Sequence, residues 1–341
     1  MENQNIIKIF EPAVARKPNY YPFAEEATDA IIKGFWSHLR FGFNRDVNEF
    51  HTLFTDEERA IIVRDLSAIG QIEIAVKTYW ANIGKIFPHP AIEEAGITFG
   101  FNETIHNKAY EKLLIKLGLE AIFEENLKLP VVRDRVKYLK KHQEKIYENN
   151  RQQQLYSLVL FSLFVENVSL FSQFYVMRWF NRWHPEHSNS NPLSEVAVQI
   201  QYTRNEETLH AQFGINLFNT ARSQYPEYVD QEFKDKVRHE AMSAYIAECN
   251  VIDWIIGSYD RPKLSAKVLK SFIQRRIDDS LIQIGIDPLF QEHAFRALDS
   301  EHRWFFEEEV SELDADNFDA HNDAYTRDDR SYDIDKDILA L

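Results

Sequence analysis

The chain has 341 residues, and its formal net charge of −15 is unevenly distributed. Residues 307–341 contain 13 acidic and 3 basic side chains, a net charge of −10, which leaves −5 for the rest of the chain. A near-neutral body with an acidic tail argues against nucleic-acid binding, which needs clustered basic side chains. The single cysteine, Cys249, excludes an internal disulfide and a thiolate metal site within one chain.

Glycine and proline are scarce, with 10 and 11 residues, which favours long helices over strands joined by turns. The longest weakly charged stretch, residues 152–177, contains Gln, Ser and Asn throughout, so we do not expect it to span a membrane. The N-terminus lacks a basic start followed by an apolar run. No signal peptide is therefore expected, and a cytoplasmic protein is predicted.

Four apolar stripes with helical spacing follow one another along the chain, and each is interrupted by a carboxylate. The first begins after a capping-box pattern, Thr55 to Glu58, and places Glu73 between Ile69 and Trp80. Its helix is therefore expected to carry one inward-facing carboxylate.

The second stripe includes the segment FNETIHNKAY, residues 101–110, where Glu103, His106 and Tyr110 share one helical face. An unpaired buried carboxylate is very costly, so Glu103 needs a partner. A bound metal ion and a buried hydrogen-bond network are both candidates.

In the third stripe, Glu166 is the only charged side chain of residues 152–177, and the fourth, after Pro192, aligns Glu207 with His210. Two helices with a lone Glu and two with Glu-x-x-His provide the ligand set of ferritin-like bundles that bind two iron or manganese ions. Four carboxylates neutralise the four positive charges of two divalent ions, and two imidazoles complete the shell. A single Glu-x-x-His pattern arises easily by chance, but four interrupted stripes do not.

The chain also resembles a known family, the radical-generating small (β) subunit of class I ribonucleotide reductase, over nearly its whole length. The similar segments are NYYPFAEEATDAIIKGFW, DEERAIIVRDLSAIGQIE, ETIHNKAY, FVENVSLFSQF, RNEETLH and FFEEEVSEL, the last followed by an acidic tail. The resemblance implies an all-α, ferritin-like helical bundle over residues 1–312 and a flexible acidic tail over residues 313–341.

The resemblance also implies roles for single residues. Trp36, Glu206 and His106 would lie on the route by which an electron and a proton leave the site, and Tyr110 would lie beside the metals. The implied metal ligands are the same six residues that the stripes select: Glu73, Glu103, His106, Glu166, Glu207 and His210.

The chain departs from the family at four positions. Glu73 and Glu206 stand where Asp is usual, and Leu170 and Thr203 replace a Phe and an aliphatic residue that help to protect a tyrosyl radical. The departures at Leu170 and Thr203 weigh against a stable radical on Tyr110. A dimanganese, a di-iron and a mixed manganese–iron pair all remain open, with manganese slightly favoured.

The implied function is to react with an oxygen species and then to oxidise a cysteine on a separate catalytic (α) subunit, which reduces the ribonucleotide. A homodimer is expected. The tail would dock on the α subunit through Ile338, Leu339 and Leu341, with Tyr325 or Tyr332 carrying the radical between the proteins. The alternative for the tail is a solvated end without a docking role.

Two other functions remain open on the same bundle. One is a dimetal oxidase or monooxygenase with its own small substrate, and the other is a ferritin-like metal-handling protein. The tail and Trp36 favour the reductase subunit over both.

Overall fold

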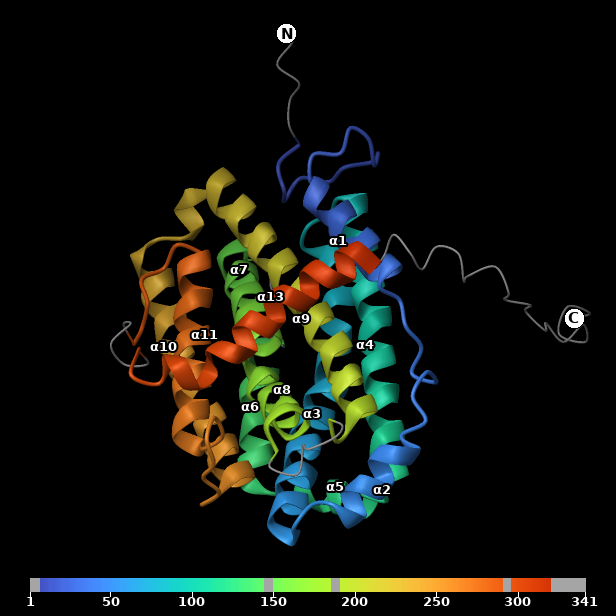
Figure 1. The fold of residues 1–341 in the computed structure, drawn as a ribbon. Helices are drawn as coiled ribbons and strands as arrows, with labels where there is room; N and C mark the ends of the chain where they lie inside the picture. Colours follow the sequence, from blue (N-terminus) through green and yellow to red (C-terminus); the bar gives the residue numbers. More distant parts are fainter. Residues whose placement is uncertain (1–6, 144–149, 185–190, 291–295, 320–341) are drawn as a thin grey trace, which may run out of the picture.

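The computed structural model describes residues 7–143, 150–184, 191–290 and 296–319, and for residues 73–77, 136, 138–143 and 310–319 it describes the backbone alone. Helices make up nearly all the regular structure of these ranges, which contain no β-strand beyond one isolated bridge between Arg261 and Leu264 (Figure 1). The prediction of an all-α protein is confirmed.

Most of the helices lie roughly parallel or antiparallel to one common axis (Figure 1). The elements are α1 (Pro22–Lys33), α2 (Asn44–Thr52), α3 (Asp56–Ala81), η1 (Ile83–Lys85), α4 (Pro90–Leu117), α5 (Glu120–Asn126), α6 (Pro130–Gln143), α7 (Arg151–Val159), η2 (Leu160–Ser169), α8 (Phe171–Trp183), α9 (Ser194–Gln224), η3 (Pro226–Tyr228), α10 (Gln231–Ile256), α11 (Ala266–Gln283) and α13 (Asp299–Asp319).

The predicted capping box fixes the start of α3. The Thr55 hydroxyl accepts a hydrogen bond from the backbone N–H of Glu58 at 3.3 Å, and the Glu58 carboxylate accepts one from the backbone N–H of Thr55 at 2.9 Å. Two otherwise unpaired backbone groups are thereby satisfied, which stabilises the first turn.

The third predicted helix differs from a regular α-helix. Between α7 and α8 the chain forms the ten-residue π-helix η2, and Glu166 lies within it. π-Helical segments are rare and often mark functional sites. The apolar stripe could not reveal this change, because every residue from Gln154 to Asn181 except Asn167 is buried, whichever way it points.

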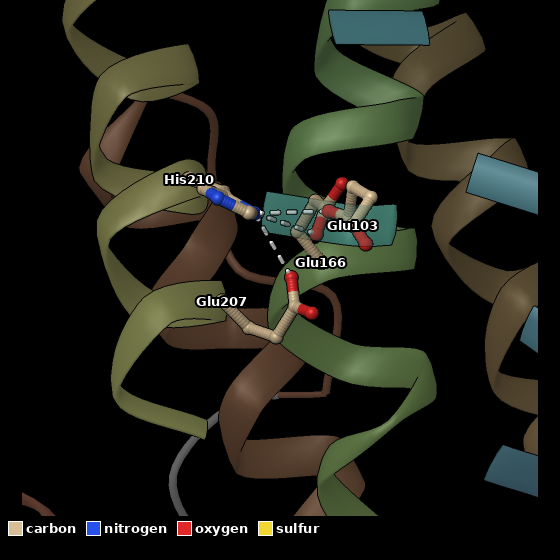
Figure 2. A group of neighbouring side chains, drawn as sticks. All are labelled: Glu103, Glu166, Glu207 and His210. Carbon is tan, nitrogen blue, oxygen red and sulfur yellow. Dashed lines mark hydrogen bonds and ion pairs between the residues drawn. The ribbon is translucent and has the colours of Figure 1, made fainter. Parts of the chain in front are cut away.

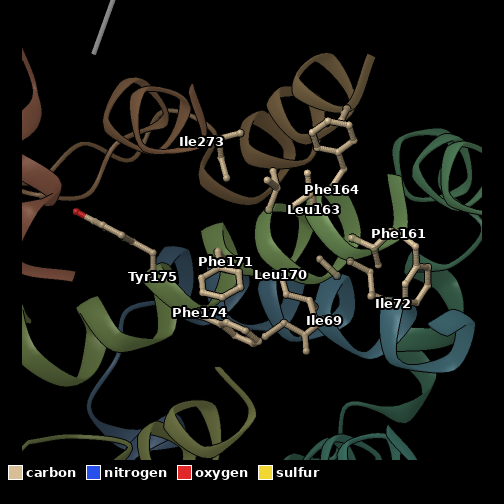
Figure 3. Packing of buried hydrophobic residues seen from close by; sticks show 14 of the residues in the cluster. Ile69, Ile72, Phe161, Leu163, Phe164, Leu170, Phe171, Phe174, Tyr175 and Ile273 are labelled. Carbon is tan, nitrogen blue, oxygen red and sulfur yellow. The ribbon is translucent and has the colours of Figure 1, made fainter. Parts of the chain in front are cut away.

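By length and composition the segment Arg151–Trp183 could cross a membrane, yet 94% of its most apolar window is buried inside the protein. This is the environment of a central core helix. Helices α3, α4, α9 and the segment from α7 to α8 pack around a common core, with α10 and α11 against η2, while α13 crosses over α9 (Figure 1). Figure 3 shows part of the apolar core, with aromatic and aliphatic side chains of α3, η2, α8 and α11.

Candidate metal centre

Three core elements bring acidic and imidazole side chains to one place. Helix α4 provides Glu103 and His106, η2 provides Glu166, and α9 provides Glu207 and His210. All five side chains are buried, with at most 1% of their surface exposed. The three carboxylates converge on the imidazole of His210, as Figure 2 shows.

The distances in this cluster are short. Nδ1 of His210 lies 3.1 Å from Oε1 of Glu103, 3.7 Å from Oε2 of Glu166 and 3.2 Å from Oε2 of Glu207. One potential ligand atom from each of these four residues lies within 4.8 Å of the others. The cluster therefore has the residue types and the size of a metal site.

His106 extends the cluster on its other side. Its Nδ1 lies 3.1 Å from Oε1 of Glu207 and 3.5 Å from Oε2 of Glu103, and its Nε2 lies 2.7 Å from Oε2 of Glu206. One ring nitrogen thus faces the cluster and the other faces a carboxylate. This is the usual arrangement of a metal-binding histidine, whose second nitrogen donates to an orienting carboxylate.

The expected exit route lies beside His106. The indole N–H of Trp36 donates to Oε2 of Glu206 at 2.9 Å, and its ring stacks on the His106 ring with 6.2 Å between centroids. Trp36 and Glu206 are both buried, at 4% and 6% exposure. The structure therefore brings the three residues expected on this route into contact.

Tyr110 is buried on α4, one turn beyond His106. Its hydroxyl donates to Oγ1 of Thr203 at 3.3 Å. Thr203 was expected to be a polar neighbour of Tyr110, and the structure places it there.

Several expected site residues lie outside what the structure describes. Glu73 belongs to α3, but its side chain is among those not described. Tyr325 and Tyr332 lie outside the described residues, as do the three expected docking residues Ile338, Leu339 and Leu341. Helix α13 continues to Asp319, beyond residue 312, where the tail is expected to begin.

The electrostatics of the cluster are those of crowded carboxylates. Burial raises the pKa of Glu166 well above its usual range, and the adjacent charge of Glu207 raises it further. Burial also acts to raise the pKa of Glu207, but hydrogen bonds with Glu166, His106 and His210 outweigh it and lower that pKa. Burial acts to lower the pKa of His210, but the adjacent carboxylates of Glu103, Glu166 and Glu207 raise it well above its usual range.

A bound cation fits this cluster. Neither oxygen of Glu103 makes a hydrogen bond of good geometry among the described residues, although the side chain is fully buried. Carboxylate oxygens and imidazole nitrogens are ligands of hard and borderline metal ions, so the donor set matches ions such as manganese and iron.

One contact in the site was not expected from the sequence. The indole N–H of Trp80 donates to Oε1 of Glu166 at 2.8 Å. In the sequence Trp80 counts only as an apolar position of the first stripe. The one available signal is that a buried indole N–H needs a hydrogen-bond acceptor.

A core cluster of three Glu and two His side chains from α4, η2 and α9 defines a helical bundle of the dimetal-carboxylate class. The chain belongs to the family of ribonucleotide reductase small chains, whose family model, "Ribonucleotide reductase, small chain", matches residues 14–297.

Individual relatives are distant in sequence and similar in fold. The chain is 23% identical over 299 residues to the "Probable ribonucleoside-diphosphate reductase small subunit 048L" of Invertebrate iridescent virus 3, covering 83% of this chain and 78% of the relative. The ribonucleotide reductase R2 subunit from Clostridium botulinum superposes with a TM-score of 0.70 at 16% identity, covering 82% and 88% of the two chains. The dimanganese(II)-NrdF of Streptococcus sanguinis does so with a TM-score of 0.70 at 15% identity, covering 86% and 99%.

Proposed function

We propose that this protein is the radical-generating small subunit of a class I ribonucleotide reductase. The observation that carries the proposal is the continuous contact from the buried cluster through His106 and Glu206 to Trp36. A metal-storage protein has no use for such a chain of aromatic and acidic groups. Membership of the small-chain family supports the same conclusion.

We propose that two metal ions per chain are held by Glu73, Glu103, His106, Glu166, Glu207 and His210. Such a pair, together with an oxygen species, would provide the strong one-electron oxidant that the reaction needs. A manganese-containing pair is proposed ahead of di-iron, because Leu170 replaces a Phe, and Thr203 an aliphatic residue, that help to protect a tyrosyl radical in the family. The dimanganese(II) form of the Streptococcus sanguinis structure supports this choice.

Three residues of the chain, His106, Glu206 and Trp36, would transfer one proton and one electron. Nδ1 of His106 faces the cluster and would be the atom that holds a metal ion, so Nε2–H would donate to Glu206 and fix the orientation of the ring. Oε2 of Glu206 also accepts the indole N–H of Trp36, so it can take that proton when an electron leaves the indole. The stacked rings of Trp36 and His106 provide the contact for the electron.

The proposed partner is a separate catalytic (α) subunit, docked through the C-terminal residues, and the proposed compartment is the cytoplasm. A homodimer is proposed as well. Helices α1 and α4 expose Ile32, Ile97 and Phe101 at 54%, 57% and 55%, and Phe35 stacks on Phe101 with 6.2 Å between ring centroids. A second copy of the chain would cover these apolar side chains.

The test combines the metal-loaded full chain with its α subunit. We expect ribonucleoside diphosphate reduction that needs both proteins and about two metal ions per β chain. The control is a chain with Glu103→Ala and Glu166→Ala, which should lose metal and activity together. Substrate oxidation by the loaded chain alone, without any stimulation by the α subunit, would instead identify a dimetal oxidase.

A further inference from the structure

A buried arginine holds the part of η2 that carries Glu166. Arg276 of α11 donates from Nε to the backbone carbonyl of Asn167 at 2.7 Å and from Nη2 to Oδ1 of the same residue at 2.5 Å. The amide of Asn167 in turn donates to Oγ of Ser280 at 2.9 Å. Asn167 directly follows Glu166, so these bonds fix the backbone next to that carboxylate.

The same arginine is connected, through Glu309, to helix α9, which carries Glu207 and His210. Its Nη1 donates to Oε2 of Glu309 on α13 at 3.0 Å, and Oε1 of Glu309 lies 3.2 Å from the hydroxyl of Thr208. Thr208 directly follows Glu207. Arg276 and Glu309 therefore contact the residues that come immediately after two of the proposed metal ligands.

The π-helix explains why such support is needed. Where a π-segment returns to α-helical winding, backbone carbonyls lose their regular partners and need other donors. Arg276 supplies a donor to the carbonyl of Asn167, and the buried Arg135 of α6 supplies one to the carbonyl of Ser169. A return of η2 to α-helical register would rotate Glu166 away from the cluster, since a residue fewer per turn changes the direction of every later side chain.

Arg276 itself is firmly placed. It is 5% exposed, its guanidinium carbon lies 3.5 Å from the centroid of the Phe171 ring, and Glu309 offsets its charge. A planar guanidinium with several fixed N–H donors can hold a carbonyl, an amide and a carboxylate at once, which a lysine cannot do.

We propose that Arg276, together with Glu309 and Asn167, is a positioning group for the metal centre: it holds η2 in the π-helical register that directs Glu166 at the cluster. This inference rests on the proposed metal centre. It assigns to α11 and α13 a role in the site, although neither helix contributes a proposed ligand.

The experiment titrates the metal-free full chain with Mn²⁺ and measures the free ion by electron paramagnetic resonance. The variants are Asn167→Ala, which removes only the amide, and Arg276→Lys, which keeps the charge opposite Glu309. We expect each to bind at least one of the two ions about 10- to 100-fold more weakly than wild type, the usual effect of losing a group that orients a ligand. Hydrogen exchange of the amides of residues 160–169 should become faster in the metal-free variants.

The matched control is Glu308→Gln. Glu308 neighbours Glu309 on α13 and is equally buried, but it pairs with Arg178, Arg182 and Arg204 rather than with Arg276. We expect this control to bind both ions with wild-type affinity. Equal weakening in Glu308→Gln, or wild-type affinity in both test variants, would overturn the positioning role. Wild-type protein that bound no Mn²⁺ would overturn the metal centre itself, and the inference with it.

Discussion

The indole N–H of Trp36 donates to Oε2 of Glu206 at 2.9 Å, although the two residues are 170 positions apart in the chain. The same oxygen lies 2.7 Å from Nε2 of His106. One carboxylate oxygen therefore joins the segment after α1 to both α4 and α9. This geometry places two N–H groups against one oxygen of Glu206, and the role proposed for Glu206 requires that it accept hydrogen bonds from both.

The first prediction replaces this acceptor. Glu206→Gln keeps the size of the side chain but cannot take a proton from Trp36, because an amide is a far weaker base than a carboxylate. We expect nucleotide reduction with the α subunit to fall by about 10²- to 10⁴-fold, the range for a lost acid–base group. Metal content, measured on the same samples, should stay at the wild-type value.

The control for this prediction is Glu206→Asp, which restores the residue usual in the family and keeps the carboxylate. It should retain most of the activity. Wild-type turnover by Glu206→Gln would show that the proton of Trp36 goes elsewhere.

The second prediction concerns Tyr110, whose hydroxyl bonds to Thr203 at 3.3 Å. A hydroxyl neighbour protects a tyrosyl radical less well than an apolar one does, so we expect the oxidising equivalent not to be stored on Tyr110. Tyr110→Phe removes only the hydroxyl and should retain more than half of the wild-type activity at equal metal content. Activity at background level in fully loaded Tyr110→Phe would mean that the tyrosine holds the radical.

The sequence predicted much of the site because four of the proposed ligands stand on regular α-helices. On α4 and α9 the spacing of Glu103, His106, Glu207 and His210 follows from 3.6 residues per turn, and the structure buries all four on the predicted faces. The position of Glu206 next to Trp36 came from the resemblance alone. No periodicity links two residues so far apart in the chain.

Other features could not be predicted, for physical reasons. The π-helix around Glu166 leaves no trace in a segment where almost every residue is buried, since hydrophobic periodicity needs an exposed face. The bonds of Arg276 to Asn167 and Glu309 depend on how α11 and α13 pack on η2. In the sequence these are ordinary charged residues, and Glu309 belongs to an acidic run typical of a solvated surface.

The third prediction concerns pH and Asp46 of α2. Its Oδ2 accepts the backbone N–H of Val196 at 2.7 Å in the first turn of α9, and burial raises the pKa of its carboxyl to about 6. A folded-state pKa above the unfolded value means that this carboxyl stabilises the fold fully below about pH 4 and loses that contribution as the pH rises through 6. Asp46→Asn cannot ionise and escapes this loss.

We therefore expect Asp46→Asn to be more stable than wild type at pH 8, by about 1–2 kcal/mol once solvent screening is allowed for. The difference should shrink as the pH is lowered from 7 to 5. Urea unfolding at several pH values measures it, with the exposed Asp260→Asn as control. A constant difference across this pH range would contradict the assignment to Asp46.

The fourth prediction concerns the exposed apolar face of α1 and α4. Phe101 is 55% exposed and stacks on Phe35, and Ile97 lies one turn before it. Phe101→Glu places a charge where a second copy is proposed to pack, so the dimer should dissociate to monomers at micromolar concentration. Light scattering after size-exclusion chromatography measures this, and Ile282→Glu, on the exposed face of α11, is the control. A dimer that persists in Phe101→Glu would place the interface elsewhere.

The last prediction concerns the C-terminal residues, which follow α13 (Asp299–Asp319). The sequence from residue 320 onward is acidic and poor in apolar residues until Ile338, Leu339 and Leu341, which we propose to anchor it in a groove of the α subunit. Deleting the last 15 residues removes this anchor together with Tyr332 and leaves the metal cluster intact. The shortened chain should bind metal like wild type but support no nucleotide reduction.

The measurement is activity with excess α subunit, alongside metal content. In a second experiment, a synthetic peptide of the deleted residues should inhibit the pair of full-length β chain and α subunit by competing for the groove. Normal turnover by the shortened chain would mean that these residues are a solvated end with no docking role.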